Sequence, residues 1–233
     1  MTKDAFDAAI ASLDADDAVR RAQAAERLAP YRVTNAVLMA AGYGSRLAPI
    51  TDHTPKGLLR VRGEVLVERQ IAQLRAADIA DIYLVVGYLK EQFSYLASDP
   101  HIHLVENEDY HCCNNTSSIF RVLDVLDNTY ICSADNYFTE NVFTPYVYCS
   151  YYASVYGDTP SEEYYLTVDG NGRITEVQIG GAHGWYMLGQ AYFSRAFSAR
   201  FAALPSQGAD AGGNAVRSSA LSNNACARAF RRA

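Results

Sequence analysis

Hydrophobic residues follow two alternating spacings through the middle of the chain. Residues 35–41 are mostly apolar and run into glycines, which is typical of a buried parallel strand. The segments that follow carry apolar side chains at helix or strand spacing in turn, and they predict helices at 66–77 and 116–126 and strands at 82–86, 103–106 and 129–133. Strands that alternate with helices predict βαβ units, and therefore an α/β fold with a mixed, mostly parallel sheet flanked by helices.

The pattern changes after residue 147, where strand-like segments follow one another without helices between them. These segments are 148–155, 164–168, 173–179 and 185–188, and a helix is predicted at 194–204. The turn sequence Asp169-Gly170-Asn171-Gly172 separates two of the strands. We therefore expect a small β-rich insertion within the α/β fold.

Both ends of the chain differ in composition from the middle. Residues 1–31 carry apolar positions at helical spacing and Pro30 should end the last turn, so they predict an N-terminal helical arm. Residues 32–204 would then form the main domain. Residues 205–233 are rich in alanine and have few large apolar side chains, which predicts a disordered tail.

Composition narrows the class of protein. The chain has 20 basic and 26 acidic residues and a formal charge of −6, which argues against a nucleic-acid-binding surface. It contains neither an apolar run long enough for a membrane span nor the apolar centre of a signal peptide. Five cysteines do not suggest a disulfide framework. These features predict a cytoplasmic protein without membrane insertion, and they leave a homo-oligomer open.

The sequence after the first predicted strand is the most informative about chemistry. It reads Gly42-Tyr43-Gly44-Ser45-Arg46-Leu47-Ala48-Pro49-Ile50-Thr51 and continues to Pro55-Lys56. Glycines allow close approach of the backbone to a ligand, successive N–H groups can hold phosphate oxygens, and Arg46 and Lys56 add positive charge. A dinucleotide-binding motif would need glycine where Leu47 stands, and a Walker A sequence is absent. We therefore expect a phosphate-binding loop of another type.

This loop resembles the signature of nucleotidyltransferases that activate sugar phosphates and phosphocholine. Four later blocks extend the resemblance over about residues 35–200, namely 63–71, 85–93, 114–118 and 135–138. Together they are similar to bacterial CTP:phosphocholine cytidylyltransferases of the LicC type. The resemblance implies a Rossmann-like nucleotidyltransferase fold in which the β-rich insertion binds the acceptor. It also implies an enzyme that joins a phosphate monoester to the α-phosphate of CTP and releases pyrophosphate.

The resemblance also implies roles for individual residues. Arg46 and Lys56 would be catalytic, because they neutralise phosphate charge in the transition state. Asp135, at the end of a predicted strand, would bind Mg²⁺ as the cofactor. The expected nucleotide-binding residues are Ala41, Gly42, Gly44, Ser45, Gly87, Tyr88, Asn115 and Ser117. Helix capping explains Asn115 and Ser117 equally well.

A group of tyrosines beside two glutamates bears on the acceptor. Aromatic faces and a carboxylate together hold a trimethylammonium group, so Glu163, Tyr164 and Tyr186 are expected to bind phosphocholine. Alternation of tyrosines along half-buried strands explains the same pattern. The predicted function is transfer of the nucleotidyl group from CTP to phosphocholine.

Two alternatives to this function remain open at this point. One is a sugar 1-phosphate acceptor. The other is a truncated nucleotide-binding remnant without turnover, because an acidic C-terminal metal-ligand segment is not recognisable.

Overall fold

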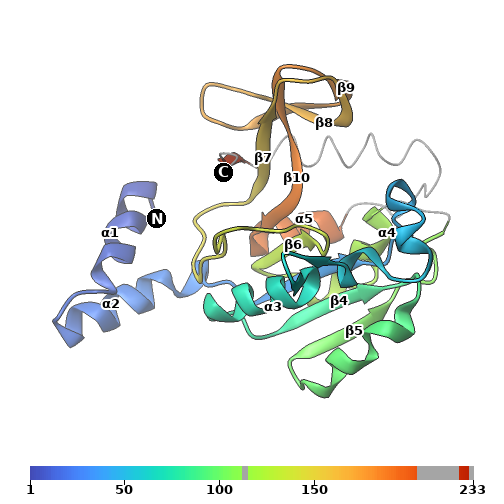
Figure 1. Cartoon of the computed structure of the whole chain (residues 1–233). Helices are drawn as coiled ribbons and strands as arrows, with labels where there is room; N and C mark the ends of the chain where they lie inside the picture. Colours follow the sequence, from blue (N-terminus) through green and yellow to red (C-terminus); the bar gives the residue numbers. More distant parts are fainter. Residues whose placement is uncertain (112–114, 204–225, 231–233) are drawn as a thin grey trace.

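The computed structural model describes residues 1–111, 115–203 and 226–230, and its centre is a mixed sheet (Figure 1). Four strands form the parallel part: β1 (Asn35–Ala40), β4 (Ile82–Val86), β5 (Ile102–Glu106) and β6 (Thr129–Ser133). β1 lies between β6 and β4, and β5 pairs with β4. The predicted parallel sheet is confirmed, and the carboxyl ends of its strands meet at one edge.

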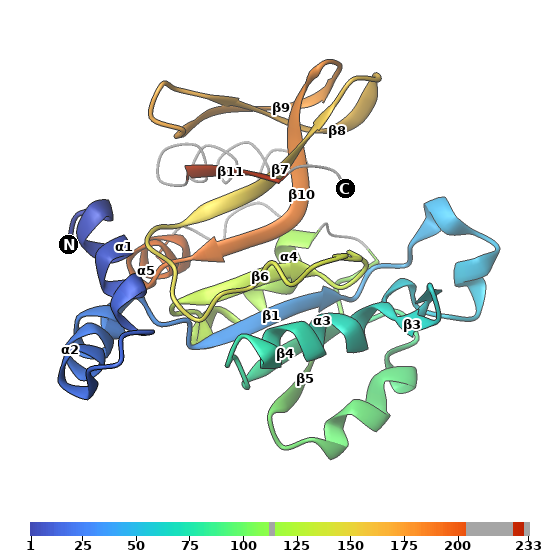
Figure 2. The ribbon, with the colours of Figure 1, turned by 60° about the vertical axis from the view of Figure 1, so that its left-hand side comes forward.

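Side chains alternate between the two faces of this sheet and build two cores. Ala36 and Leu38 belong to the core that the apolar side chains of α3 (Leu66–Ala76) share. The helix α3 lies alongside the parallel strands (Figure 2). Val37 packs in the other core, with Val122 and the helix α5 (Arg195–Ala202). The short helix α4 (Asn115–Phe120) lies on that same side, where Ile119 joins the core. Helices on both faces explain why the parallel strands read as nearly continuous apolar runs.

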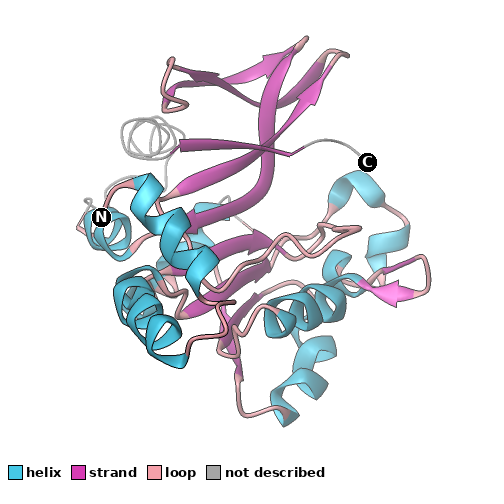
Figure 3. Ribbon diagram, turned by 90° about the vertical axis from the view of Figure 1, so that its left-hand side faces the viewer, coloured by secondary structure: helices cyan, strands magenta, loops and turns pink. Residues whose placement is uncertain are grey.

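Four antiparallel strands follow: β7 (Tyr151–Gly157), β8 (Ser161–Val168), β9 (Ile174–Gly181) and β10 (Gly184–Phe193). β10 joins the two parts of the sheet, because its end pairs with β6 while its beginning pairs with β7 and β8. Residues 151–187 form the β-insertion, and its strands extend beyond the helical layers (Figure 3). Its own small core consists of Leu166 and Ile174, with partly buried neighbours. The predicted β-rich insertion is therefore present.

The first 31 residues contain the two expected helices, α1 (Lys3–Ser12) and α2 (Ala18–Leu28). Thr2 caps the first helix and Asp17 the second, by accepting hydrogen bonds from backbone N–H groups of the first turn. Phe6 packs against Tyr31 and Tyr148, with ring centroids 5.3 and 5.5 Å apart. The helices are thus fixed to the segment that leads into the β-insertion.

Short elements complete the described chain. They are the hairpin β2 (Arg60–Val61) and β3 (Glu64–Val65) and the 3₁₀ helices η1 (Ala29–Tyr31), η2 (Ser45–Leu47), η3 (Ile50–Asp52), η4 (Lys56–Leu58), η5 (Lys90–Ser98) and η6 (Leu123–Val125). The sequence pattern does not predict η5. The helix expected at 116–126 is also shorter, because it ends at Phe120 and gives way to η6. Among the described residues, no helix is long and apolar enough to cross a membrane.

Most of the predicted disordered tail lies outside the described residues. Within it, however, Cys226–Phe230 forms β11, which pairs in parallel with β7. The prediction was wrong for these five residues. An edge strand is held by main-chain hydrogen bonds, which do not require large apolar side chains.

Candidate active site

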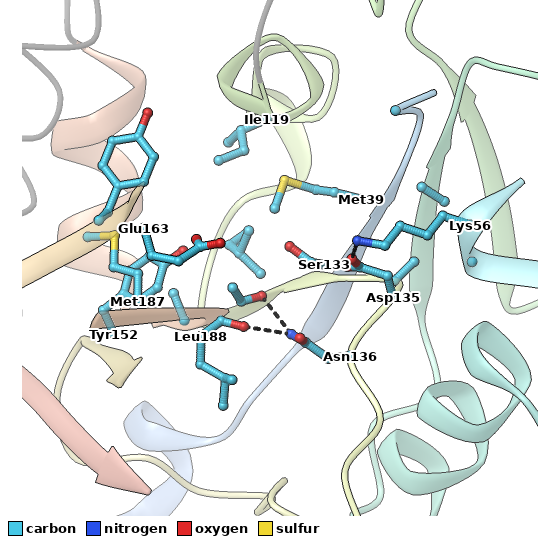
Figure 4. Close-up of a pocket in the computed structure, with 18 of the residues that line it drawn as sticks. Met39, Lys56, Ile119, Ser133, Asp135, Asn136, Tyr152, Glu163, Met187 and Leu188 are labelled. Carbon is cyan, nitrogen blue, oxygen red and sulfur yellow. Dashed lines mark hydrogen bonds and ion pairs between the residues drawn. The ribbon is translucent and has the colours of Figure 1, made fainter. Parts of the chain in front are cut away.

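A cavity of about 700 Å³ opens where the carboxyl ends of the parallel strands meet the β-insertion (Figure 4). One wall consists of the loop after β1, with Gly42, Gly44, Ser45, Arg46 and Lys56, and the loop after β6, with Asp135. The opposite wall belongs to the β-insertion. Ligands of open α/β sheets bind at this place, beyond the carboxyl ends of the strands.

The loop after β1 folds back on itself at Gly44. This residue has a φ of +73°, and a Cβ atom there would lie 3.1 Å from Cγ2 of Thr51 and 3.3 Å from Cβ of Lys56. The hydroxyl of Thr51, fully buried, donates to the carbonyl of Gly44 at 3.1 Å. Glycine is therefore required at this position, and the fold of the loop brings Lys56 beside its beginning.

Lys56 and Asp135 form an ion pair across this wall (Figure 4). Both side chains line the cavity, and the Asp135 side chain is 27% exposed. The two loops approach closely beside this pair, because a Cβ atom on Gly57, which follows Lys56, would lie 3.3 Å from Cβ of Ala134, which precedes Asp135. The structure thus places the predicted catalytic lysine directly beside the predicted metal-binding carboxylate.

A second ion pair connects the two walls. Nη1 of Arg46 donates to Oε1 of Glu163 at 3.2 Å. The Arg46 side chain is 89% exposed, so solvent screens this pair and the guanidinium is free to move. The cavity therefore has two cations on its phosphate loop, each paired with a carboxylate that the sequence also singled out.

The cavity brings together the three predicted acceptor residues, Glu163, Tyr164 and Tyr186, and adds Tyr152. Burial of its hydroxyl raises the pKa of Tyr152 to about 12, so this side chain stays neutral at physiological pH. Other aromatic residues of the insertion do not line the cavity. Trp185 packs on Tyr156 with ring centroids 5.5 Å apart. Alternation along the strands accounts for these residues.

Four predicted nucleotide-binding residues lie outside the cavity lining, namely Ala41, Gly87, Tyr88 and Ser117. The backbone N–H of Tyr88 donates to the carbonyl of Ala41 at 3.0 Å, and its hydroxyl donates to the carbonyl of Asp52 at 2.8 Å. Its ring packs on Tyr43 with centroids 4.5 Å apart. In this structure Tyr88 therefore fastens the phosphate loop, and its contact with a base stays a prediction.

The other two positions in this group also have structural partners. A Cβ atom on Gly87 would lie 2.8 Å from the Tyr110 ring, so glycine is needed for this packing. The hydroxyl of Ser117 accepts from Nδ2 of the buried Asn107 at 2.8 Å. The side chain of Asn115 lies outside the described part of the structure. Nucleotide contact by any of the three stays a prediction.

Sequence reasoning missed the polar residues that tie the walls together. Nδ2 of Asn136 donates to the carbonyls of Leu188 at 2.9 Å and Gly189 at 3.3 Å (Figure 4). Gly189 has a φ of +78°, and a Cβ atom there would lie 2.8 Å from Oγ of Ser133. Asn136 stands next to the flagged Asp135 and could have been noticed. Gly189 carries no local signal, because the irregular pairing of β10 with β7 creates its conformation.

The donor set fits a magnesium ion held partly by its substrate. Among the described residues, no cluster of three or more His, Cys, Asp or Glu side chains could hold a metal. Asp135 is instead one carboxylate beside a phosphate-binding loop. Mg²⁺ is commonly bound by one or two carboxylates together with substrate phosphates, so Asp135 is a suitable protein ligand.

Comparisons with known proteins agree with this arrangement. Residues 36–215 match the model of the MobA-like NTP transferase domain. The chain is 40% identical over 173 residues to the 2-aminoethylphosphonate cytidylyltransferase of Lancefieldella rimae, which covers 72% of this chain and 70% of the relative. It is 37% identical over 158 residues to the choline-phosphate cytidylyltransferase of Streptococcus pneumoniae, with 68% and 69% coverage.

Solved structures of nucleotidyltransferases share the fold of this chain. The CTP:phosphocholine cytidylyltransferase of Streptococcus pneumoniae superposes with a TM-score of 0.75 at 29% identity, over 85% of this chain and 90% of that one. The inositol-1-phosphate CTP transferase from T. maritima shares the fold with a TM-score of 0.64 at 17% identity, over 86% of each chain. The predicted fold class and family resemblance are confirmed. The chain therefore belongs to the MobA-like NTP transferases and, within them, to the enzymes of the cytidylyltransferase family.

Proposed function

We propose that this enzyme transfers the cytidylyl group of CTP to a small acceptor that carries a phosphoryl or phosphonyl anion and an ammonium group, with phosphocholine as the first candidate. One observation carries the proposal. A single cavity has a phosphate-binding loop with Arg46 and Lys56 on one wall and Glu163 with Tyr164 and Tyr186 on the other. The two walls match the opposite charges of such an acceptor.

The reaction would need charge neutralisation more than a strong base. An oxygen of the acceptor attacks the α-phosphorus of CTP, and the bond from that phosphorus to the oxygen shared with the β-phosphate breaks. Pyrophosphate leaves with the electron pair. The attacking group is already an anion, so Arg46 and Lys56 act by holding phosphate oxygens and stabilising the charge of the transition state. Asp135 would hold Mg²⁺, which supplies further neutralisation of the triphosphate.

Binding of the nucleotide would release the two carboxylates from their ion pairs with Arg46 and Lys56. Triphosphate oxygens offer Arg46 and Lys56 several negative charges in place of one carboxylate each. When the cations turn toward the nucleotide, Glu163 becomes available to the ammonium group of the acceptor. Asp135 likewise becomes available to the metal.

A second candidate acceptor is 2-aminoethylphosphonate, which the name of the 40% identical relative specifies. Both acceptors combine an anion with an ammonium group. They differ in the cation, since a primary ammonium forms hydrogen bonds to a carboxylate, whereas trimethylammonium gains more from aromatic faces. Glu163 therefore suits the primary ammonium of 2-aminoethylphosphonate, and the tyrosines suit the cation of either acceptor.

Pyrophosphate release tests the proposal. The enzyme is incubated with CTP, Mg²⁺ and phosphocholine, 2-aminoethylphosphonate, phosphoethanolamine or glucose 1-phosphate in turn. We expect turnover with phosphocholine or 2-aminoethylphosphonate, and a rate at least tenfold lower with glucose 1-phosphate. Preference for glucose 1-phosphate would contradict the acceptor assignment. CTP binding without pyrophosphate release in the presence of any of these acceptors would favour the nucleotide-binding remnant instead.

A further inference from the structure

The glutamine at position 70 is a polar residue on the apolar face of α3. It is 0% exposed, and it shares this face with Val67, Ile71 and Leu74 of the same helix. An amide group is costly to bury unless hydrogen bonds replace those it makes to water. The hydrogen-bond partners of Gln70 therefore indicate its role.

Those partners bracket Asp135. Nε2 of Gln70 donates to the carbonyl of Ser133 at 3.0 Å and to the carbonyl of Asn136 at 2.9 Å. Residues 134–140 have no helix or strand, so their carbonyls lack regular backbone partners and need other donors. The carbonyl of Ser133, the last residue of β6, also accepts from the backbone N–H of Asn136 at 3.3 Å. One amide group thus fixes the backbone on both sides of the carboxylate that faces Lys56.

Neighbouring side chains of α3 hold the remainder of the same loop. Nε of Arg69 donates to the carbonyl of Phe138 at 2.9 Å. Nε2 of Gln73 donates to the carbonyls of Phe138 and Glu140, each at 3.1 Å. These contacts lie beyond Asp135 in the chain, so Gln73 resembles Gln70 in chemistry and burial but not in what it holds.

The buried glutamine at position 70 does not give the fold the greatest stability. Oε1 of Gln70 is buried and, like Oε1 of Gln73, lacks a hydrogen-bond partner among the described residues. A buried acceptor without a partner costs free energy. The position therefore retains a glutamine whose amide nitrogen is fully used and whose oxygen is not.

We propose that Gln70 is a positioning residue for catalysis. Its bridge between Ser133 and Asn136 sets the place of the Asp135 carboxylate relative to Lys56, and with it the site for the metal–triphosphate complex. This inference rests on the proposed function, in which Asp135 holds Mg²⁺. Residues that orient a metal ligand typically change metal affinity or activity 10- to 100-fold when they are replaced.

Manganese titration of the CTP complex, without an acceptor, tests this inference. Gln70→Met keeps the length of the side chain and removes the amide, while Gln73→Met makes the same change one turn further along the helix. We expect Gln70→Met to weaken Mn²⁺ binding about 10- to 100-fold and Gln73→Met to leave it within about threefold. In the complete reaction kcat should fall in Gln70→Met, while the KM for CTP changes less. A Gln70→Met protein that loses thermal stability but binds Mn²⁺ like the wild type would overturn the inference.

Two further variants separate the outcomes. Asp135→Asn should weaken Mn²⁺ binding at least as much as Gln70→Met. If Asp135→Asn has no effect, the metal role in the proposed function fails. If Asp135→Asn has its effect and Gln70→Met has none, only the positioning role fails. Should Gln70→Met not fold, Gln70→Asn replaces it: this side chain is one methylene shorter and cannot span both carbonyls, so wild-type Mn²⁺ binding by Gln70→Asn would contradict the proposal.

Discussion

Two regions of this enzyme meet at the cavity, and they are built in different ways. The parallel half, which consists of β1, β4, β5 and β6 with the helices on their faces, has a large buried core on each side. The β-insertion has only Leu166 and Ile174 as buried members of its own cluster. The parallel half carries the phosphate loop and Asp135, whereas the insertion carries Glu163 and the tyrosines.

Under the proposed function, this difference would separate the nucleotidyl-transfer chemistry from the recognition of the acceptor. Charge stabilisation needs groups held in fixed positions, and a helix-covered sheet supplies such positions. A small antiparallel extension contributes less to global stability, so its side chains can change at lower cost to the fold. The relatives named above share cytidylyl transfer but differ in the acceptors that their names specify.

The largest contrast should appear in core substitutions. Leu84 and Ile174 are both 0% exposed, the first in the parallel half and the second in the β-insertion. Truncation of such side chains to alanine costs ~2–5 kcal/mol, depending on how well the site relaxes. We expect Leu84→Ala near the upper end in urea unfolding and Ile174→Ala near the lower end.

Amide hydrogen exchange shows which elements lose protection in each of these two variants. Ile174→Ala should raise exchange mainly in β8 and β9, because the cluster around Leu166 and Ile174 is small. Leu84→Ala should raise exchange throughout the sheet. Equal and global destabilisation by both substitutions would show that the insertion is not an independent unit.

Removal of the phosphate-loop charge should impair every acceptor equally. Lys56→Ala is expected to lower kcat/KM by about a hundredfold or more, ~3 kcal/mol, since in the proposed function the lysine stabilises charge in the transition state. Lys90→Ala is the matched control, because Lys90 pairs with Glu106 and does not line the cavity. A loss confined to one acceptor would place Lys56 on the acceptor side of the site.

The acceptor wall should show the opposite behaviour. Glu163→Gln keeps the shape of the side chain and removes its charge, so KM for a cationic acceptor should rise about tenfold, ~1.4 kcal/mol, while KM for CTP changes little. Glu162 is exposed and does not line the cavity. Glu162→Gln should therefore behave like the wild type. Equal effects of the two substitutions would rule out a specific contact by Glu163.

The smallest effect concerns an ion pair within the parallel half, between the first residue of α5 and the segment that leads into β6. Arg195, which follows β10, donates to the carboxylate of Asp127, which precedes β6, and this hydrogen bond lowers the pKa of Asp127. A lowered pKa contributes stability above the unfolded value, near 3.8, and the contribution is lost as the pH falls through the folded value. Asp127→Asn should lower the Tm slightly at pH 7, and this difference should shrink below about pH 4. A difference that does not depend on pH would mean that charge is not its cause.

The sequence predicted features that depend on residues close together in the chain, and it failed for features that depend on residues far apart. Strand β1 and the loop from Gly42 to Lys56 could be predicted because burial and local backbone geometry determine them. The end of α4 at Phe120 could not, since tertiary packing overrode the helical spacing of the residues that follow. Simple alternation along β8 could not separate Glu163 from Glu162, because the pairing with β9 is irregular between Ser161 and Tyr164, and the adjacent Glu163 and Tyr164 both line the cavity.

The sequence by itself determined the α/β class, the phosphate loop and the charged residues Arg46, Lys56, Asp135 and Glu163. Only the tertiary structure decided that Lys56 pairs with Asp135 and Arg46 with Glu163, and that Gln70 donates to the carbonyls on both sides of Asp135. The physical reason is distance along the chain. Loop and strand preferences act between near neighbours, whereas these contacts join residues that meet only after the sheet has formed and its core has packed.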